Sequence, residues 1–371
     1  MSLRRTLAKG SVLTYDRLLR WYGAVPRVVG RGRALPPLHI LLRVTPHCNL
    51  RCKMCIVLPV VIGKQSTHGD RQILTTAEWK RVIDDIPRRA LLSFTGGEPL
   101  VRGDIVELIR HASRHHKTHL ITNATLLDEE KLSALMDMTP RRFLGAGFSY
   151  LGVSVHGLPE THNTITGLSD AFERAADALT KVRDEKRRRR SRYPIVHLAT
   201  VVMAGNIGEL LDMVDFAASV GAEIWNVLLD YRADESCWCG EMTVSDFCRT
   251  PLPRDRIDRA EFERVIIELK RRARTKRIQL RLPRMPVREM AEFYENRTDV
   301  SRFACGSVWT KAYIASTGTV HPCYELAMGN VRETSLKAIW NSAEYRAFRQ
   351  QVKRRRIFPL CAGCCDAYFR G

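Results

Sequence analysis

Short apolar runs alternate with helical patterns along most of this sequence, and this alternation restricts the fold more than any other feature. Six apolar runs fit β-strands, at residues 38–44, 90–94, 118–122, 150–155, 195–202 and 223–229. Helical patterns separate them, at residues 75–85, 104–116, 128–137, 169–187 and 207–219. Parallel neighbouring strands need a crossover between them, and a helix usually provides it. This order therefore predicts an α/β protein built on a parallel sheet.

Three cysteines follow the first strand candidate with the spacing C-x3-C-x2-C; they are Cys48, Cys52 and Cys55. Three thiolates on one short loop can bind three irons of a cubane cluster and leave the fourth iron open to another ligand. A structural tetrahedral metal site needs four ligands, and no fourth cysteine or histidine follows at a natural spacing. On this loop alone, buried cysteines or a zinc site are the alternative.

A second motif, Gly96-Gly97-Glu98-Pro99, follows the second strand candidate. The two motifs, in this order, resemble those of the radical S-adenosylmethionine (SAM) enzymes. The signature of that family is a cysteine triad on the loop after the first strand and a Gly-Gly-Glu-Pro turn after the second. The resemblance implies that the three cysteines bind a [4Fe–4S] cluster, whose open iron binds the amine and carboxylate of SAM.

The resemblance also implies a fold and roles for single residues. The fold is a partial (β/α)6 TIM-like barrel, in which active groups lie on loops at the C-terminal ends of the strands. Gly96 and Gly97 would let the backbone approach the methionyl amine of SAM closely, because they carry no Cβ. Glu98 would orient that amine or its neighbours.

Four further barrel positions are weaker candidates for contacts with the cofactor. Asn123 ends the third strand candidate and Ser154 the fourth, where family members often have Ser-x-Asp-Gly and His156 replaces the acid. Val202 lies where the family places an apolar edge against adenine. Strand-end capping and ordinary barrel packing are the alternatives for these positions. For His156, we favour an ordinary hydrogen-bonded histidine over a proton relay.

The character of the sequence changes after residue 300, where a second group of cysteines begins. It comprises Cys305, Cys323, Cys361 and Cys364, and Cys365 is a fifth cysteine that could substitute for Cys364. This pattern resembles the SPASM auxiliary-cluster domain of radical SAM enzymes, in its shortened form called the twitch domain. The resemblance implies a second [4Fe–4S] cluster held by the four thiolates. A structural zinc site made of the same thiolates is the alternative.

The chain is therefore expected to have four parts. They are a basic amphipathic segment (1–37), the radical SAM barrel (38–250), a bridging region (251–299) and the SPASM/twitch domain (300–371). In the bridging region we expect one helix, Arg259 to Lys276, and a strand near residues 278–282. Three more cysteines lie near the expected mouth of the active site, and we expect them to be packed or incidental. They are Cys237, Cys239 and Cys248.

The sequence is strongly basic, with 60 Lys and Arg against 40 Asp and Glu, a formal charge of +20. A field of this sign favours acidic partners, such as an anionic lipid surface or an acidic electron donor like flavodoxin or ferredoxin. Solvated surface arginine is the simpler explanation. Nucleic acid is not expected, because the basic run at residues 186–190 lacks interleaved aromatic residues. Residues 11–22 fit an amphipathic helix, which adds the expectation of peripheral membrane contact.

No stretch approaches the roughly 20 apolar residues of a membrane span, and no signal-peptide pattern follows the N-terminal arginines. We therefore expect a cytoplasmic protein. The 11 cysteines then indicate metal or redox chemistry rather than disulfides.

The predicted function is that of a radical SAM enzyme. It would cleave SAM reductively to a 5′-deoxyadenosyl radical, which abstracts hydrogen from a substrate C–H bond. We expect oxidative modification of a small molecule or peptide, by dehydrogenation or by C–C, C–S or C–O bond formation. The segment before residue 38 is short for a separate leader-binding domain, which weakens the peptide version. The alternatives are radical modification of a lipid or isoprenoid at an anionic membrane surface, and a non-enzymatic metal-binding module.

Overall fold

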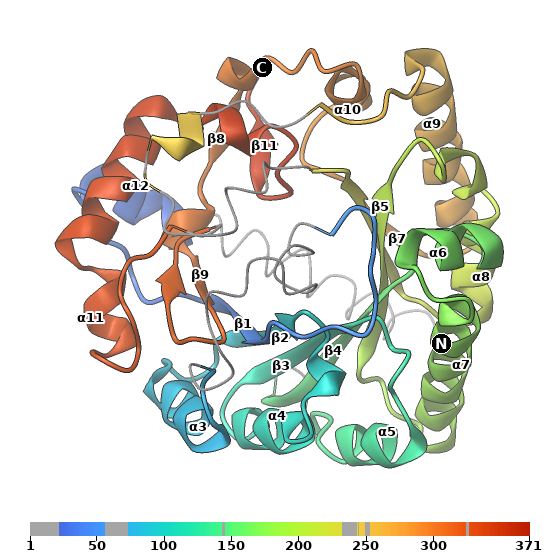
Figure 1. The fold of residues 1–371 in the computed structure, drawn as a ribbon, viewed down its shortest axis with the longest axis horizontal. Helices are drawn as coiled ribbons and strands as arrows, with labels where there is room; N and C mark the ends of the chain where they lie inside the picture. Colours follow the sequence, from blue (N-terminus) through green and yellow to red (C-terminus); the bar gives the residue numbers. More distant parts are fainter. Residues whose placement is uncertain are drawn as a thin grey trace.

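A curved sheet with helices on its outer side forms the framework of the computed structural model (Figure 1). The structure describes residues 22–55, 73–142, 145–231, 243, 245–248, 253–323 and 326–371. Within these ranges, the sheet has the strand order β10-β9-β1-β2-β3-β4-β5-β6-β7. Every neighbouring pair is parallel except β10 and β9. The predicted parallel α/β sheet of a partial barrel is confirmed.

The first six strands match the six predicted apolar runs. They are β1 (His39–Thr45), β2 (Leu91–Gly96), β3 (Lys117–Thr122), β4 (Gly147–Ser154), β5 (Ile195–Val202) and β6 (Ile224–Leu229). The remaining strands of the sheet are β7 (Gln279–Arg281), β9 (Lys311–Ile314) and β10 (Val320–His321). The predicted bridging region supplies β7, and the predicted C-terminal domain supplies β9 and β10. The sheet therefore joins three of the four predicted parts of the chain.

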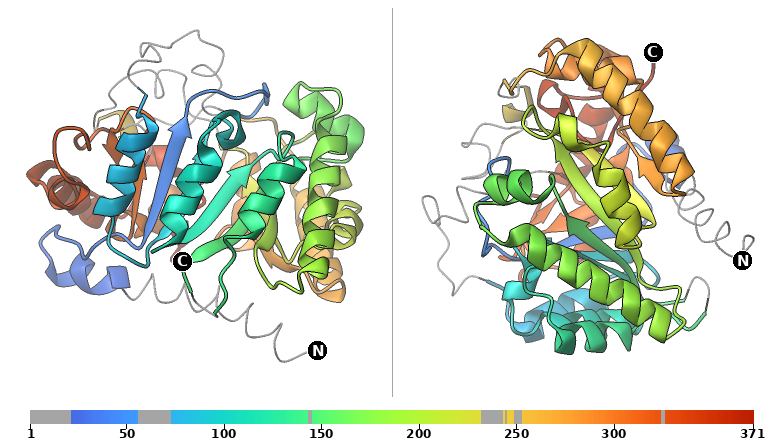
Figure 2. Two further views of the ribbon diagram at one scale, coloured as in Figure 1. Left: turned by 90° about the horizontal axis from the view of Figure 1, so that it is seen from below. Right: turned by 90° about the vertical axis from the view of Figure 1, so that its right-hand side faces the viewer.

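Helices follow the strands and cover the convex face of the sheet (Figure 2). Those of the barrel are α3 (Thr76–Asp85), α4 (Ile105–Ser113), α5 (Glu129–Met136), α6 (Pro159–Thr166), α7 (Ala171–Arg188) and α8 (Met213–Ser219). Later in the chain come α9 (Arg259–Thr275), α10 (Val287–Tyr294), α11 (Leu336–Trp340) and α12 (Ala343–Arg355). A capping box between Thr75 and Glu78 begins α3, because each residue satisfies a backbone N–H of the other.

Burial alternates along the strands and distinguishes the two faces of the sheet. In β1, Ile40 and Leu42 are fully buried in the core, whereas Leu41 and Arg43 are only half-buried. Successive side chains of a strand point to opposite faces. The buried set therefore packs under the helices, and the half-buried set lines the concave face, on the side of the sheet opposite the described barrel helices.

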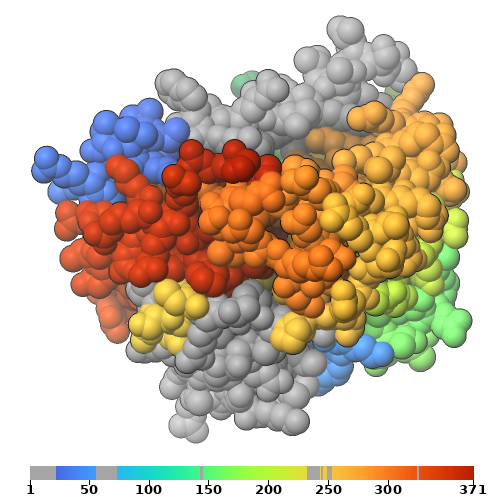
Figure 3. Space-filling view, turned by 90° about the horizontal axis from the view of Figure 1, so that it is seen from above, coloured from blue at the N-terminus to red at the C-terminus, as the bar shows by residue number. Residues whose placement is uncertain are grey.

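The C-terminal part of the chain packs beside β1. A short two-stranded sheet pairs β8 (Phe303–Cys305) with β11 (Ala367–Phe369). The described chain begins in a helix at residues 22–29, and Figure 3 shows this part beside the C-terminal residues. All but the last residue of the helix predicted at 11–22 lies outside the described residues. Among the helices that the structure describes, none is long and apolar enough to cross a membrane.

Candidate active site

The three cysteines of the first motif lie on the loop that follows β1. All three are free, half-buried thiols, and the backbone N–H of Cys55 donates to the carbonyl of Cys52 at 3.0 Å. Burial raises the pKa of Cys48 and raises that of Cys52 to about 12, and the neighbouring thiols add to both shifts. Such thiols keep their protons until a cation displaces them, as metal binding does. This donor set fits an iron–sulfur cluster.

The turn after β2 fastens the start of the cysteine loop. The backbone N–H of Gly97 donates to the carbonyl of Thr45 at 2.8 Å, and that of Glu98 donates to the carbonyl of His47 at 2.7 Å. From the other side, Arg51 and Lys53 donate backbone hydrogen bonds to the end of α6, at 2.9 and 3.0 Å. The cysteines are therefore held between two parts of the barrel.

The two glycines of the second motif are required by this contact. A Cβ on Gly96, whose φ is +145°, would lie 2.3 Å from the carbonyl oxygen of Thr45. A Cβ on Gly97 would lie 2.1 Å from the carbonyl oxygen of His47. The sequence suggested that the missing Cβ atoms leave room for the methionyl amine of SAM. In the structure, the cysteine loop occupies that side of both glycines.

Glu98 joins the turn after β2 to the end of β3. Its carboxylate accepts from the N–H of Leu100 at 2.9 Å, the hydroxyl of Thr122 at 2.6 Å and the N–H of Asn123 at 2.7 Å. The side chain is 1% exposed, and burial raises its pKa to about 7 although the hydrogen bonds oppose the shift. Glu98 therefore has a clear role in joining these strand ends, and orientation of the SAM amine stays a prediction.

Asn123 contacts the cysteine loop itself. Its side-chain amide donates to Asn49 at 3.0 Å, and Asn49 in turn donates to the hydroxyl of Thr125 at 2.8 Å. The Thr125 hydroxyl donates back to Asn123 at 2.8 Å and completes a ring of three polar side chains. Because Asn49 lies between Cys48 and Cys52, the ring fixes the loop where it turns. Asn49 and Thr125 could not be predicted as site residues, since polar loop residues are common.

The other cofactor candidates differ in position. Ser154 is half-buried at the end of β4, on the concave face. Val202 is fully buried on the helix-covered face, and its carbonyl accepts from the Tyr294 hydroxyl at 2.7 Å. Alternation places the neighbouring Val201 on the concave face, and the contact of Val202 with adenine stays a prediction.

His156 has the environment of a structural histidine, as expected. Its Nδ1 accepts from the backbone N–H of Val201 at 3.3 Å, and its ring stacks on that of His162 with centroids 5.9 Å apart. Burial lowers the pKa of His156 to about 3, so the ring stays neutral.

The structure brings the C-terminal cysteines together. Cys305 ends β8, Cys323 follows β10, and Cys361 ends a 3-10 turn (Pro359–Cys361) shortly before Cys364. Burial raises the pKa of Cys305, Cys323 and Cys361, and each also feels the charge of other members of the group. Cys364 shares a hydrogen bond with Cys365, which raises the pKa of Cys364 and lowers that of Cys365.

Three other cysteines lie near the expected mouth of the active site in the sequence. Cys248 is exposed, and Cys237 and Cys239 lie outside the described residues. Within the described ranges, no set of three His, Cys, Asp or Glu side chains is arranged to hold a single metal ion. The choice between iron–sulfur and zinc for the C-terminal group therefore depends on the comparison with known proteins.

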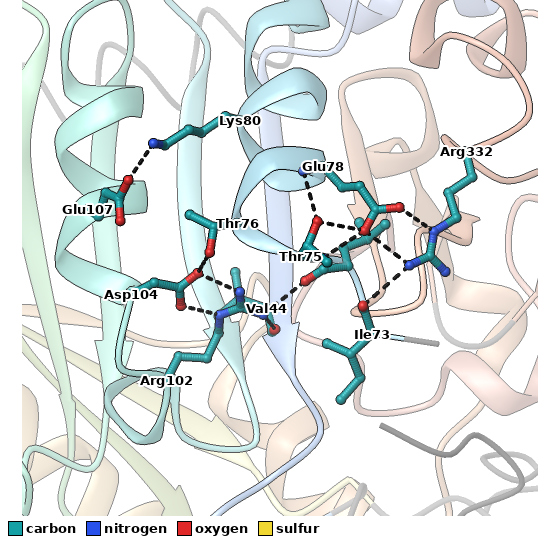
Figure 4. A network of polar contacts seen from close by, with 11 residues as sticks. Val44, Ile73, Thr75, Thr76, Glu78, Lys80, Arg102, Asp104, Glu107 and Arg332 are labelled. Carbon is teal, nitrogen blue, oxygen red and sulfur yellow. Dashed lines mark hydrogen bonds and ion pairs between the residues drawn. The ribbon is translucent and has the colours of Figure 1, made fainter. Parts of the chain in front are cut away.

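Polar contacts connect the C-terminal part to the start of α3 (Figure 4). The guanidinium of Arg332 donates to Glu78 at 2.8 Å and to the carbonyl of Ile73 at 3.3 Å. These hydrogen bonds tie the C-terminal cysteine region to the chain that returns from the cysteine loop. Neither contact could be predicted, because its partners lie more than 250 residues apart in the sequence.

Two family models match the sequence. Residues 42–217 match the Radical SAM superfamily, and residues 305–365 match SPASM, an iron–sulfur cluster-binding domain. An AdoMet-dependent heme synthase of Methanosarcina barkeri is 27% identical over 358 residues, covering 88% of this chain and 91% of that protein. A PqqA peptide cyclase of Bradyrhizobium diazoefficiens is 32% identical over 190 residues. That match covers 50% of this chain and 45% of the cyclase, so it spans about half of each.

Solved structures share the fold. Streptococcus suis SuiB bound to S-adenosylmethionine superimposes with a TM-score of 0.62 at 16% identity, covering 89% of this chain and 71% of SuiB. Native anSMEcpe, with bound AdoMet and the Cp18Cys peptide, superimposes with a TM-score of 0.56 at 18% identity. The match covers 86% of this chain and 84% of anSMEcpe.

The chain belongs to the radical SAM superfamily, and it carries a C-terminal SPASM domain. It is an enzyme that binds a [4Fe–4S] cluster and SAM, with auxiliary iron–sulfur binding in the SPASM domain. The predicted family, enzyme class and cofactors are confirmed.

Proposed function

We propose that the enzyme carries out an oxidative modification of a small molecule or peptide at the concave face of the barrel. When bound and reduced, the cluster would supply one electron to SAM, which yields methionine and a hydrogen-abstracting 5′-deoxyadenosyl radical. Cys48, Cys52 and Cys55 would ligate that cluster. The auxiliary cluster would have four ligands, Cys305, Cys323, Cys361 and Cys364. One observation carries the proposal: the Gly-Gly-Glu turn and the cysteine loop are fastened together at the C-terminal ends of parallel strands.

Residues of this chain would hold the reacting groups rather than carry the redox chemistry. The turn after β2 and the Asn49–Asn123–Thr125 ring fix the cysteine loop, and Ser154 offers a hydroxyl on the concave face. The experiment incubates reduced enzyme with deuterated candidate substrates and follows deuterium into 5′-deoxyadenosine by mass spectrometry. SAM cleavage with deuterium transfer supports the proposal, and absence of 5′-deoxyadenosine from reduced, cluster-loaded enzyme contradicts it.

The charge of the sheet supports a substrate with an acidic group. The nine described strands of the sheet contain no Asp or Glu. They do contain Arg43, Lys117, Arg281 and Lys311, and alternation places all four on the concave face. Lys311 forms an ion pair with Asp366, so Arg43, Lys117 and Arg281 supply the positive charge that would favour an acidic ligand on this face.

Neutral imidazoles line the same face. Nε2 of His39 lies 2.8 Å from the hydroxyl of Ser93, which lies 2.9 Å from Nδ1 of His119. The ring of His197 lies 4.9 Å from that of His119, centroid to centroid. Burial lowers the pKa of His39 and His197 to about 3, so these rings contribute hydrogen-bonding atoms without charge. Such a lining fits a polar substrate better than a hydrocarbon.

A second candidate function, radical modification of a lipid at an anionic membrane surface, is favoured by one exposed surface. Helix 22–29 exposes Val25, Val28 and Val29 by 54%, 68% and 72%. The ammonium of Lys353 donates to the carbonyl of Val28 at 2.8 Å, and Lys353 begins an exposed basic run at 353–356. Apolar side chains beside basic ones are typical of surfaces that bind anionic lipid.

Vesicle flotation distinguishes this candidate. The wild-type enzyme should float with vesicles that contain phosphatidylglycerol and not with pure phosphatidylcholine. The Val28→Asp/Val29→Asp variant should lose this binding, and Ile267→Asp should retain it, because Ile267 is 61% exposed on α9. Absence of wild-type binding at low salt would exclude the lipid candidate. The basic charge would then be better explained by an acidic electron donor, such as flavodoxin or ferredoxin.

A further inference from the structure

One arginine contacts the chain on both sides of the cysteine loop. Arg102 follows the short helical turn that continues the Gly-Gly-Glu-Pro motif (Pro99–Val101), and its side chain is 14% exposed. Its Nη1 donates to the carbonyl of Val44 at 3.0 Å (Figure 4). The same Nη1 donates to the carbonyl of Leu74 at 3.2 Å. Val44 lies near the end of β1, and Leu74 lies just before α3. The segment between them contains all three cysteines of the first motif.

A carboxylate fixes this guanidinium in place. Nε and Nη2 of Arg102 donate to the two oxygens of Asp104, both at 2.7 Å, in a bidentate pair. Asp104 also accepts from the hydroxyl of Thr76 at 2.5 Å. Burial opposes ionisation, but these hydrogen bonds prevail and lower the pKa of Asp104, so the pair stays charged. Bidentate arginine pairs are strong and geometrically specific. We call Arg102, Asp104 and the carbonyls of Val44 and Leu74 the loop clasp.

The loop clasp differs from the other contacts of the loop, because one guanidinium joins its two ends. The turn after β2 and the Asn49 ring fix the loop between Thr45 and Asn49. Arg102 instead fixes the distance between Val44 and Leu74, which lie on either side of the loop. Holding both ends of the loop lowers its conformational entropy. The three thiols are then kept in the arrangement that binds the cluster.

We propose that Arg102 is a positioning residue for the SAM cluster, acting through the loop clasp. The proposal rests on the proposed function in one respect, the assignment of the three loop cysteines as cluster ligands. It predicts that loss of the clasp impairs the SAM cluster selectively. The auxiliary cluster, held by cysteines outside the clasp, should be unaffected and serves as an internal reference.

The experiment compares Arg102→Met, Arg102→Lys and Lys80→Met in the anaerobically reconstituted full chain. Lys80 pairs with Glu107 in the same region but contacts neither flank of the loop, so its variant is the matched control. The measurements are iron content, electron paramagnetic resonance of the two reduced clusters, and the change in the spectrum on titration with SAM. Arg102→Met should lose the SAM-responsive signal or need roughly tenfold more SAM to reach it. Arg102→Lys should fold and show a smaller defect of the same kind, because lysine lacks the planar fork.

Each result decides the proposal. A selective defect at the SAM-responsive cluster, with an intact auxiliary signal and a normal Lys80→Met variant, supports it. An Arg102→Met variant with wild-type SAM response overturns it, as does equal loss of both clusters in Arg102→Met and Arg102→Lys. If the wild-type loop cysteines bound no iron, the proposed function would fail first and the clasp proposal with it.

Discussion

Replacing Gly97 with alanine tests how closely the cysteine loop depends on the turn after β2. The new Cβ would lie 2.1 Å from the carbonyl oxygen of His47, 2.5 Å from its carbonyl carbon and 2.8 Å from the carbonyl oxygen of Pro46. All three are backbone atoms, so no side chain can move aside. Restoring normal contact requires the loop to move by roughly 1 Å beside Cys48. A displacement of that size near reacting groups can cost on the order of 100-fold in rate.

The assay follows 5′-deoxyadenosine by chromatography from reduced enzyme and SAM, without substrate. Gly97→Ala should lower this rate on the order of 100-fold and cost about 1–3 kcal/mol in free energy of unfolding, the usual range for overpacking. Gly103→Ala is the control, because no heavy atom lies within 4 Å of its added Cβ. A Gly97→Ala rate within about twofold of wild type would refute the coupling of turn and loop, since the overlap would then have been relieved without moving the thiols.

Three further predictions concern other sites. Cys361→Ala should retain cleavage of SAM but stop product formation; equal loss of both would indicate a structural role alone. Burial raises the pKa of Glu98 from 4.5 to about 7. The folded state therefore holds a proton that the unfolded state releases, and the free energy of unfolding should fall by roughly 2 kcal/mol between pH 5 and 7. Glu98→Gln should lack this slope in anaerobic urea unfolding at pH 5 and 7; identical slopes would contradict the assignment. Gly152→Ala should cost about 1–3 kcal/mol, because its Cβ would lie 2.4 Å from Nε2 of His197. Gly205→Ala should leave the free energy of unfolding unchanged, because no heavy atom lies within 4 Å of its added Cβ.

Much of the barrel could be predicted because its signals are local. The run at 195–202 matched β5 at both ends, and Arg259 to Lys276 matched α9 within one residue. The two motifs also fell at strand ends, where the family places its active groups. A period-two pattern does not say which face is concave, however. The sequence alone therefore did not show that the side chain of Val202 packs under the helices.

The contacts that hold the site could not be predicted, because they join residues distant in sequence. Arg332 reaches Ile73 across 259 positions, and Asn123 reaches Asn49 across 74. The partner of Arg332 is a backbone carbonyl and that of Asn123 is the side chain of a common polar loop residue, so neither contact leaves a recognisable pattern in the sequence. Arg102 follows the Gly-Gly-Glu-Pro motif, yet nothing in its neighbourhood indicates that it reaches Val44 and Leu74. Sequence motifs identified the chemistry, and only the fold showed how the cysteine loop is held.

The most direct measurement is electron paramagnetic resonance of the reduced protein before and after addition of SAM, for wild type and Cys52→Ala. If the loop cysteines bind a cluster with one open iron, SAM will alter the wild-type spectrum and leave that of the variant unchanged. A wild-type spectrum that SAM does not alter would contradict the account.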